Sequence, residues 1–142
     1  MITREIQLTD RITGAPALEN FTVATTEVDG EVLVRTDRVG LAATYLEPMR
    51  ADCTIPVPAW QPGQRVGVAA IGTVVRSDSP DLEAGDLVQS MTGWSEHFGR
   101  WLGEGRLVYP ETVVDGGIED VPQAFLSLLG GSYRGNVSVR LS

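Results

Sequence analysis

The hydrophobic and polar positions of this chain alternate over short stretches, a pattern that is typical of β-strands. Turns rich in Gly, Pro and Asp separate these stretches, as at Asp29-Gly30 and Gly85-Asp86. Many short strands joined by such turns predict a mainly β protein with a small barrel. The pattern places strands at residues 5–8, 21–25, 31–36, 67–76, 86–91, 111–114 and 136–141.

Two segments have patterns that predict helices. Residues 41–49 form the first, which stops at a loop containing Pro56, Pro58 and Pro62. Residues 121–129 form the second, with apolar residues spaced for one helix face and a Gly-Gly pair after them. The pattern therefore predicts a small, partly open β-barrel with one or two short helices.

Composition narrows the possible partners. The chain has 142 residues, enough for one domain with a real core, and its net charge of -8 disfavours binding to nucleic acid. No long apolar run predicts a membrane span, and the first ten residues lack the apolar core of a secretory signal, so we expect a cytoplasmic protein. Because Cys53 and His97 are the only residues of their types, we expect no metal site.

A series of motifs in the first two thirds of the chain resembles a known family. It consists of GEVLVRT at residues 30–36, IGTVV at 71–75, Pro80, GDLV at 85–88, and Gly-Trp at 93–94. Their order and spacing resemble the prostaglandin reductase or leukotriene dehydrogenase branch of the zinc-free medium-chain dehydrogenases/reductases. Residues 1–98 are thus similar to the N-terminal part of that family.

The remaining residues resemble the extreme C-terminus of the same family. The similar strings lie at residues 101–107, 111–114, 122–125 and 128–129. In that family a Rossmann domain separates the two parts, whereas this sequence has no glycine-rich dinucleotide fingerprint. The resemblance therefore implies one GroES-like catalytic domain over residues 1–142, with 99–142 as its C-terminal part. It also implies that this chain binds neither NADP nor NAD, so no cofactor is expected.

Three residues are candidates for catalysis because of the family positions they occupy. Tyr45 falls within a conserved pocket string of the family, and it either points into the cleft as a hydrogen-bond donor or packs as an amphipathic residue. His97 replaces an aromatic residue and is either a general acid/base or a surface histidine. Tyr133 occupies the position of a cofactor-contacting Asn, and it either fills that void or polarises a substrate carbonyl.

Five further residues are candidates for substrate binding. Arg50 and Asp52 lie on the Pro-rich loop, where they either bind a polar substrate group or face solvent. Trp60 and Trp94 either line an apolar pocket or, in the case of Trp94, support the fold. Glu96 adjoins His97, although neighbours on a strand point to opposite faces.

The leading functional hypothesis from the sequence is a cofactor-independent enzyme of bacterial polyketide-type metabolism. It would catalyse cyclisation, conjugate addition or isomerisation of an unsaturated carbonyl compound, which is an apolar small molecule. The alternatives are a non-catalytic small-molecule binding protein and the catalytic half of a split NADPH-dependent reductase. The missing Rossmann domain should leave the aromatic segment from Trp94 to Trp101 exposed, with three large aromatic side chains, so a homodimer is expected through this segment.

Overall fold

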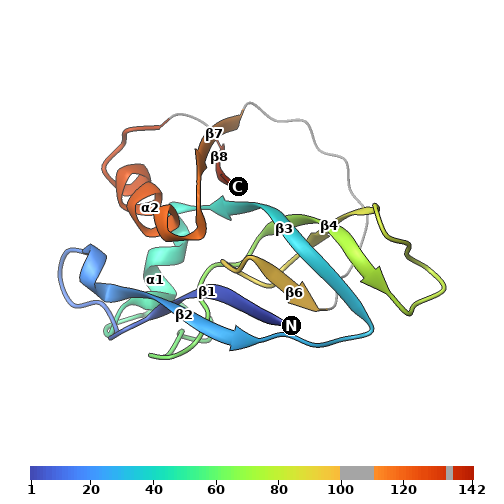
Figure 1. The fold of residues 1–142 in the computed structure, drawn as a ribbon. Coiled ribbons are helices and arrows are strands. Elements are labelled where there is room, and N and C mark those ends of the chain that lie inside the picture. The colour runs from blue at the N-terminus through green and yellow to red at the C-terminus, as the bar shows by residue number, and fades with distance from the viewer. Residues whose placement is uncertain (100–110, 134–135) are drawn as a thin grey trace.

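The computed structural model describes residues 1–99, 111–133 and 136–142, and it shows a mainly β molecule with two short α-helices (Figure 1). This confirms the predicted fold class. The strands are β1 (Ile2–Leu8), β2 (Phe21–Glu27), β3 (Val32–Leu41), β4 (Ala70–Ser77), β5 (Leu87–Ser90), β6 (His97–Gly99), β7 (Glu111–Gly116) and β8 (Asn136–Leu141). The helices are α1 (Leu46–Met49) and α2 (Val121–Leu129), and single turns of 3-10 helix lie at Leu18–Asn20, Ala43–Tyr45 and Ile118–Asp120.

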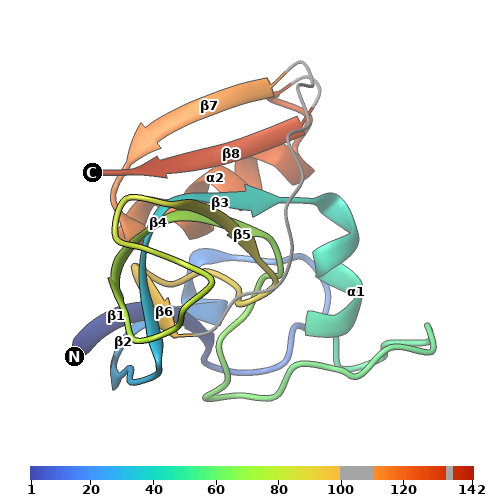
Figure 2. The ribbon, with the colours of Figure 1, turned by 90° about the vertical axis from the view of Figure 1, so that its right-hand side faces the viewer.

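The strands form two sheets that enclose the core. Strands β1 and β2 pair antiparallel as a long hairpin, and the larger sheet has the order β5-β4-β3-β8-β7, with β6 also paired to β3. Figure 2 shows β7 and β8 at one end of the molecule, with α2 behind them, and the β1-β2 hairpin at the opposite end. The described strands therefore make an open sheet, not a closed barrel.

Strand β3 pairs with strands from both the N-terminal and the C-terminal part of the described chain. Along one edge its first half pairs with β6, through Leu33–Arg35, and its second half pairs with β8, through Arg38–Leu41. Strand β8 is in turn parallel to β7, and α2 lies in the connection between them. The prediction that residues 136–141 pair with the N-terminal half is confirmed.

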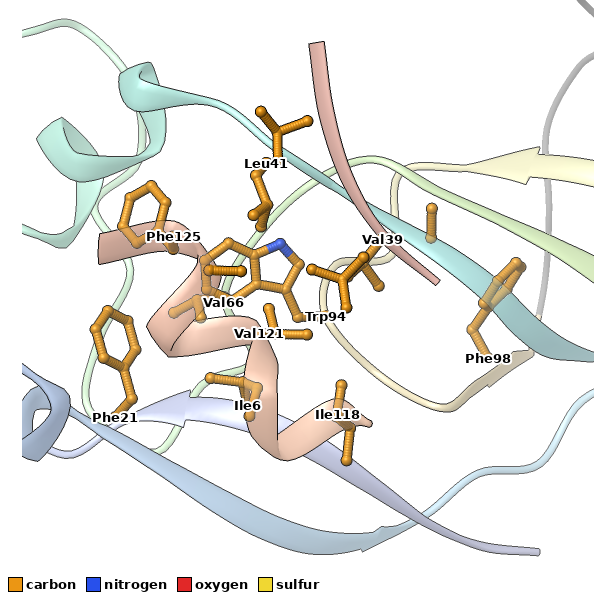
Figure 3. Packing of buried hydrophobic residues seen from close by; sticks show 14 of the residues in the cluster. Ile6, Phe21, Val39, Leu41, Val66, Trp94, Phe98, Ile118, Val121 and Phe125 are labelled. Carbon is orange, nitrogen blue, oxygen red and sulfur yellow. The ribbon is translucent and has the colours of Figure 1, made fainter. Parts of the chain in front are cut away.

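Trp94 lies at the centre of the core, between the sheets and α2 (Figure 3). Its indole has no exposed surface, and it meets the ring of Phe125 edge-on at a centroid distance of 5.3 Å. Gly67, with φ +83°, approaches the same indole so closely that a Cβ there would lie 2.3 Å from Trp94 Cδ1. Packing this tight requires glycine, because a methyl group at Gly67 would displace the ring.

The structure differs from the predicted elements in several bounds; β1 begins at Ile2 instead of residue 5, and β3 extends to Leu41 instead of residue 36. The segment expected to be helical from residue 41 begins with the last residue of β3, because Leu41 pairs with Val137. The strand expected from residue 67 starts at Ala70, because the positive φ of Gly67 is incompatible with a strand. Strand β6 was not predicted at all. Within the described residues, no helix combines the length and apolarity needed to cross a lipid bilayer.

Candidate functional site

Tyr45, Trp60 and Trp94 form a contiguous aromatic group beside α1. The centroid of the Tyr45 ring lies 5.9 Å from that of Trp60, in an edge-on arrangement, and 6.3 Å from that of Trp94. Tyr45 and Trp60 are both half-buried and pack against the core, whereas Trp94 lies wholly inside it. The two half-buried rings therefore present aromatic surface over a rigid base, which suits an apolar ligand.

The phenol of Tyr45 is held in a fixed position. Its oxygen accepts a hydrogen bond from the backbone N–H of Ala69 at 3.3 Å, which leaves the phenolic hydrogen for another acceptor. Burial raises the pKa of Tyr45 above its ordinary value of 10.0, and the Ala69 hydrogen bond opposes that effect only in part. The side chain is thus a protonated donor at neutral pH.

Arg50 and Asp52, at the end of α1, bind each other. Arg50 Nε lies 3.0 Å from Asp52 Oδ1, and Arg50 Nη1 donates to the carbonyl oxygen of Gly14 at 3.2 Å. The hydrogen bond from Arg50 lowers the pKa of Asp52, whose side chain is 73% exposed. A carboxylate with a lowered pKa in solvent is a weak base, so the pair suits binding of a polar group better than proton transfer.

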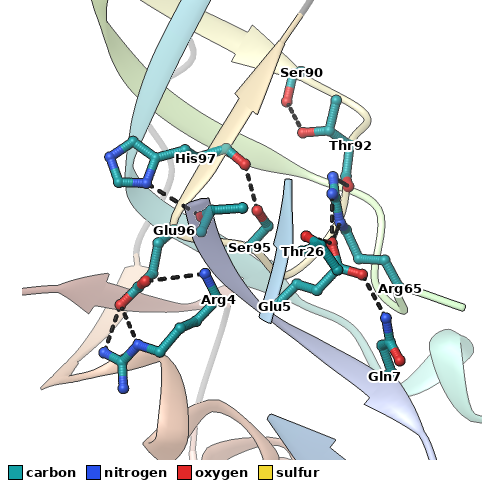
Figure 4. Close-up of polar contacts among 11 residues, drawn as sticks. Arg4, Glu5, Gln7, Thr26, Arg65, Ser90, Thr92, Ser95, Glu96 and His97 are labelled. Atoms are coloured by element: carbon teal, nitrogen blue, oxygen red, sulfur yellow. Dashed lines mark hydrogen bonds and ion pairs between the residues drawn. The ribbon is translucent and has the colours of Figure 1, made fainter. Parts of the chain in front are cut away.

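Glu96 and His97 lie against β1, and their side chains have different partners (Figure 4). His97 Nδ1 is 3.2 Å from the hydroxyl of Thr3, while Glu96 forms an ion pair with Arg4 at 2.6 Å. The pKa of His97 lies below its ordinary value of 6.5, mainly because burial penalises the imidazolium form. His97 is therefore a neutral imidazole at pH 7.

Tyr133 follows α2 and packs, partly buried, against the core. The eight predicted site residues therefore do not form one cluster. Tyr45, Trp60 and Trp94 are in contact, Arg50 and Asp52 pair with each other, and Glu96 and His97 line β1. Trp94 offers no surface to a ligand, and its indole N–H donates to the carbonyl oxygen of Gly40 at 3.0 Å.

The aromatic segment on which the homodimer was predicted is not an exposed flank where it is described. Trp94 and Phe98 are 0% and 1% exposed, because both side chains enter the core. Trp101 lies outside the described residues. The expectation of exposed aromatic surface at residues 94 and 98 is therefore wrong, although dimer formation itself stays a prediction.

A buried charged group on β1 was missed by the sequence analysis. Glu5, 4% exposed, binds Arg65 at 2.5 Å and also accepts hydrogen bonds from Gln7 at 2.8 Å and Thr26 at 3.3 Å (Figure 4). Arg65 also donates to the carbonyl oxygen of Thr92 at 3.1 Å. Strand alternation gave no signal for this burial, because it places Glu5 with the polar Thr3 and Gln7 on the face opposite Ile6 and Leu8.

The beginning of α2 is the place where the fold most resembles an anion-binding helix terminus. Gly116 and Gly117 precede it, but the N–H of Gly117 donates to a carboxylate oxygen of Asp120 at 2.8 Å. Glu119 adds a second carboxylate, and Pro122 has no N–H to offer in the first turn. In the described ranges, no group of three or more His, Cys, Asp or Glu side chains is arranged to hold a metal ion.

Comparison with known proteins identifies relatives for most of the chain. A family model described as the N-terminal domain of oxidoreductase matches residues 4–103. The NADPH-dependent curcumin reductase of Escherichia coli K12 is 32% identical over 98 residues. That alignment covers 63% of this chain but only 27% of the enzyme, so the chain spans about a quarter of the length of this relative.

Two solved structures of CurA from Vibrio vulnificus are similar to the fold. One covers 99% of both chains with a TM-score of 0.83 at 12% identity, so the likeness extends over the N-terminal strands and the β7-α2-β8 segment alike. The other, a complex with NADPH, is 27% identical with a TM-score of 0.57 and covers 66% of this chain and 29% of that chain. The first likeness concerns the fold alone.

Proposed function

Because the chain belongs to the family of N-terminal domains of oxidoreductases of the medium-chain dehydrogenase/reductase type, we propose that it is the substrate-binding half of an NADPH-dependent reductase. The single observation that carries this proposal is the family match over residues 4–103. The curcumin reductase of E. coli, to which the chain is 32% identical, is NADPH-dependent by name. We therefore propose unsaturated, aromatic carbonyl compounds as the substrate class.

The proposed reductase needs a nucleotide-binding domain from outside the described residues. The beginning of α2 does not fit a pyrophosphate, because Glu119 and Asp120 place two negative charges there. The Gly117 N–H that would bind a phosphate oxygen is already donated to Asp120. In this proposal residues 1–98 and 99–142 form one substrate domain of the prostaglandin reductase branch, and a separate nucleotide-binding domain supplies the cofactor site.

The aromatic group beside α1 is the proposed substrate surface. Tyr45 and Trp60 offer ring faces and edges for an apolar, conjugated molecule. The Tyr45 oxygen accepts a hydrogen bond from the Ala69 N–H, so the phenolic hydrogen is available to a ligand. In the proposed reaction the Tyr45 hydroxyl donates a hydrogen bond to the substrate carbonyl. A donor in this position stabilises negative charge that develops on the carbonyl oxygen.

The proposal is tested with the chain alone and with an added nucleotide-binding domain. Curcumin binding to the chain is followed by tryptophan fluorescence, and NADPH oxidation by absorbance. We expect the chain alone to bind curcumin without oxidising NADPH, and to support turnover once the nucleotide-binding domain of a related reductase is inserted between residues 99 and 111. NADPH oxidation by the chain alone, or failure to bind any unsaturated carbonyl compound, would overturn the proposal.

Two tyrosine variants locate the substrate surface. In the chimeric enzyme, Tyr45→Phe should lower kcat at least about tenfold, because it removes a donor to the developing oxyanion. Tyr133→Phe tests the other candidate donor and should leave kcat unchanged, and equal loss in both variants would contradict the role of Tyr45. The cyclase and carrier hypotheses stay predictions from the sequence. Turnover without NADPH would favour the first, and binding without turnover in the chimera the second.

A further inference from the structure

Strand β5 forms one border of the larger sheet, and its outer edge is uncharged. Within the described part of the chain it pairs only with β4, through residues 87–90. Residues 87–93 read Leu-Val-Gln-Ser-Met-Thr-Gly, with no charged residue and no proline, although 21% of the chain is charged. Exposed sheet edges usually carry charges or proline, which prevent pairing with other chains.

The hydrogen-bonding groups of β5 point to this edge at alternate residues. The N–H of Val74 donates to the carbonyl oxygen of Asp86 at 2.9 Å, so Asp86 faces β4. Since the direction alternates along an antiparallel strand, Leu87 and Gln89 turn their N–H and C=O groups away from β4. The edge thus offers a regular set of donors and acceptors.

The side chains of the edge are complementary to a second copy of themselves. Leu87 and Met91 are each 72% exposed, and Gln89 lies between them on the same face. When two β5 strands run antiparallel with Gln89 opposite Gln89, each Leu87 lies opposite the Met91 of the other copy. This register also brings the outward backbone groups of the two Gln89 residues together as a hydrogen-bonded pair.

We propose that two copies of this chain associate by pairing their β5 strands antiparallel, about a two-fold axis at Gln89. The register brings the two most exposed apolar side chains of the edge, Leu87 and Met91, into contact across the pair and places no like charges opposite each other. The strand at the other border, β7, differs because Asp115 is 73% exposed and bound to Arg140 at 3.0 Å. Two β7 strands pairing in this way would bring such charges near each other. This inference is independent of the proposed reductase function.

Charge substitution at the two-fold axis tests the proposed pairing. Gln89→Lys places two ammonium groups opposite each other, and Gln89→Glu two carboxylates, so each variant alone should raise the dissociation constant of the dimer at least about tenfold. Mixing the two variants should restore association, because the opposed charges then attract. Thr22→Lys, an exposed position on β2, is the matched control and should leave association unchanged.

A disulfide at the same position gives a second, geometric readout. A hydrogen-bonded antiparallel pair has a Cα–Cα distance of about 5.5 Å, which a disulfide can span. In a Cys53→Ser background, Gln89→Cys should therefore form covalent dimers under mild oxidation, whereas Thr22→Cys should not. Wild-type protein that sediments as a monomer at roughly millimolar concentration would overturn the proposal. So would a dimer that is indifferent to both charge variants, and a mixture that stays monomeric.

Discussion

Two neighbouring residues of β1, Arg4 and Glu5, each bind an oppositely charged partner that is distant in sequence, but on opposite faces of the strand. Arg4 meets Glu96 at 2.6 Å, with side chains that are 48% and 26% exposed. Glu5 meets Arg65 at 2.5 Å, with side chains that are 6% and 25% exposed. The two distances are nearly equal, so the surroundings distinguish the pairs.

The comparison teaches that solvent determines how much each ion pair contributes. Water already solvates Arg4 and Glu96, and salt screens their attraction. Glu5 has lost that water, and its carboxylate depends on Arg65, Gln7 and Thr26 for every hydrogen bond shown. Removing Arg65 leaves a buried carboxylate without an opposite charge, which is far more costly than the attraction itself.

The largest expected effect comes from removing Arg65. Arg65→Met should lower the free energy of unfolding by about 3 kcal/mol, because the Glu5 carboxylate is left buried and unpaired. The double variant Glu5→Leu with Arg65→Met should recover most of that loss, since no buried charge remains. Urea denaturation followed by circular dichroism measures both. If the single and double variants were equally unstable, the cost would lie in packing and not in the isolated carboxylate.

A smaller effect on stability is expected at His97, which contacts the buried Thr3 of β1 but is itself half-exposed. Its folded-state pKa is lowered below 6.5, so the unfolded chain binds a proton more readily than the folded chain. The neutral His97 side chain therefore makes its full contribution to the free energy of unfolding above pH 6.5. This contribution is lost as the pH falls through 6.5 towards the lower pKa of the folded state.

Thermal melts between pH 5 and pH 8 measure this dependence. His97→Gln should flatten the decline of the melting temperature below pH 6.5, because glutamine does not titrate. A wild-type melting curve that did not change between pH 7 and pH 5.5 relative to the variant would show that burial of His97 has no energetic consequence.

The smallest effect is expected at Arg4, whose guanidinium is solvated. Arg4→Ala should change the urea midpoint only slightly, because exposed ion pairs contribute little to stability. Any difference from the wild type should shrink as salt is raised, since the attraction to Glu96 and Glu119 is screened. A loss of stability as large as that of Arg65→Met, or one unaffected by salt, would contradict the contrast between the two ion pairs of β1.

The sequence predicted the elements whose signals are local. Residues 121–129 carried an apolar face, a first-turn proline and a terminal Gly-Gly pair, and α2 has those bounds. Residues 136–141 likewise match β8. Strand β6 was missed because three residues carry too little pattern, and His97–Gly99 become a strand only by pairing with Leu33–Arg35.

The candidate site was less accessible to sequence analysis because its contacts join distant residues. Trp94 was a candidate for lining a pocket, but Gly67, Gly40 and Phe125 enclose it. None of these contacts has a signature in the residues next to Trp94. Glu5 and Arg65, separated by 60 positions, also come together only through the sheet geometry. The likeness to oxidoreductases, by contrast, lay in ordered local strings and was readable directly.

The edge that β6 and β8 share on β3 also determines when the chain can fold. Residues 38–41 of β3 pair with residues 137–140 along one edge, and these partners come about a hundred positions later in the chain. In a nascent chain on the ribosome, that edge of the second half of β3 therefore stays unpaired until synthesis has passed β8. Sheets that depend on such non-local pairing fold slowly, in milliseconds to seconds, and are open to aggregation meanwhile. We expect this protein to rely on chaperones during synthesis more than a helical bundle of equal length does.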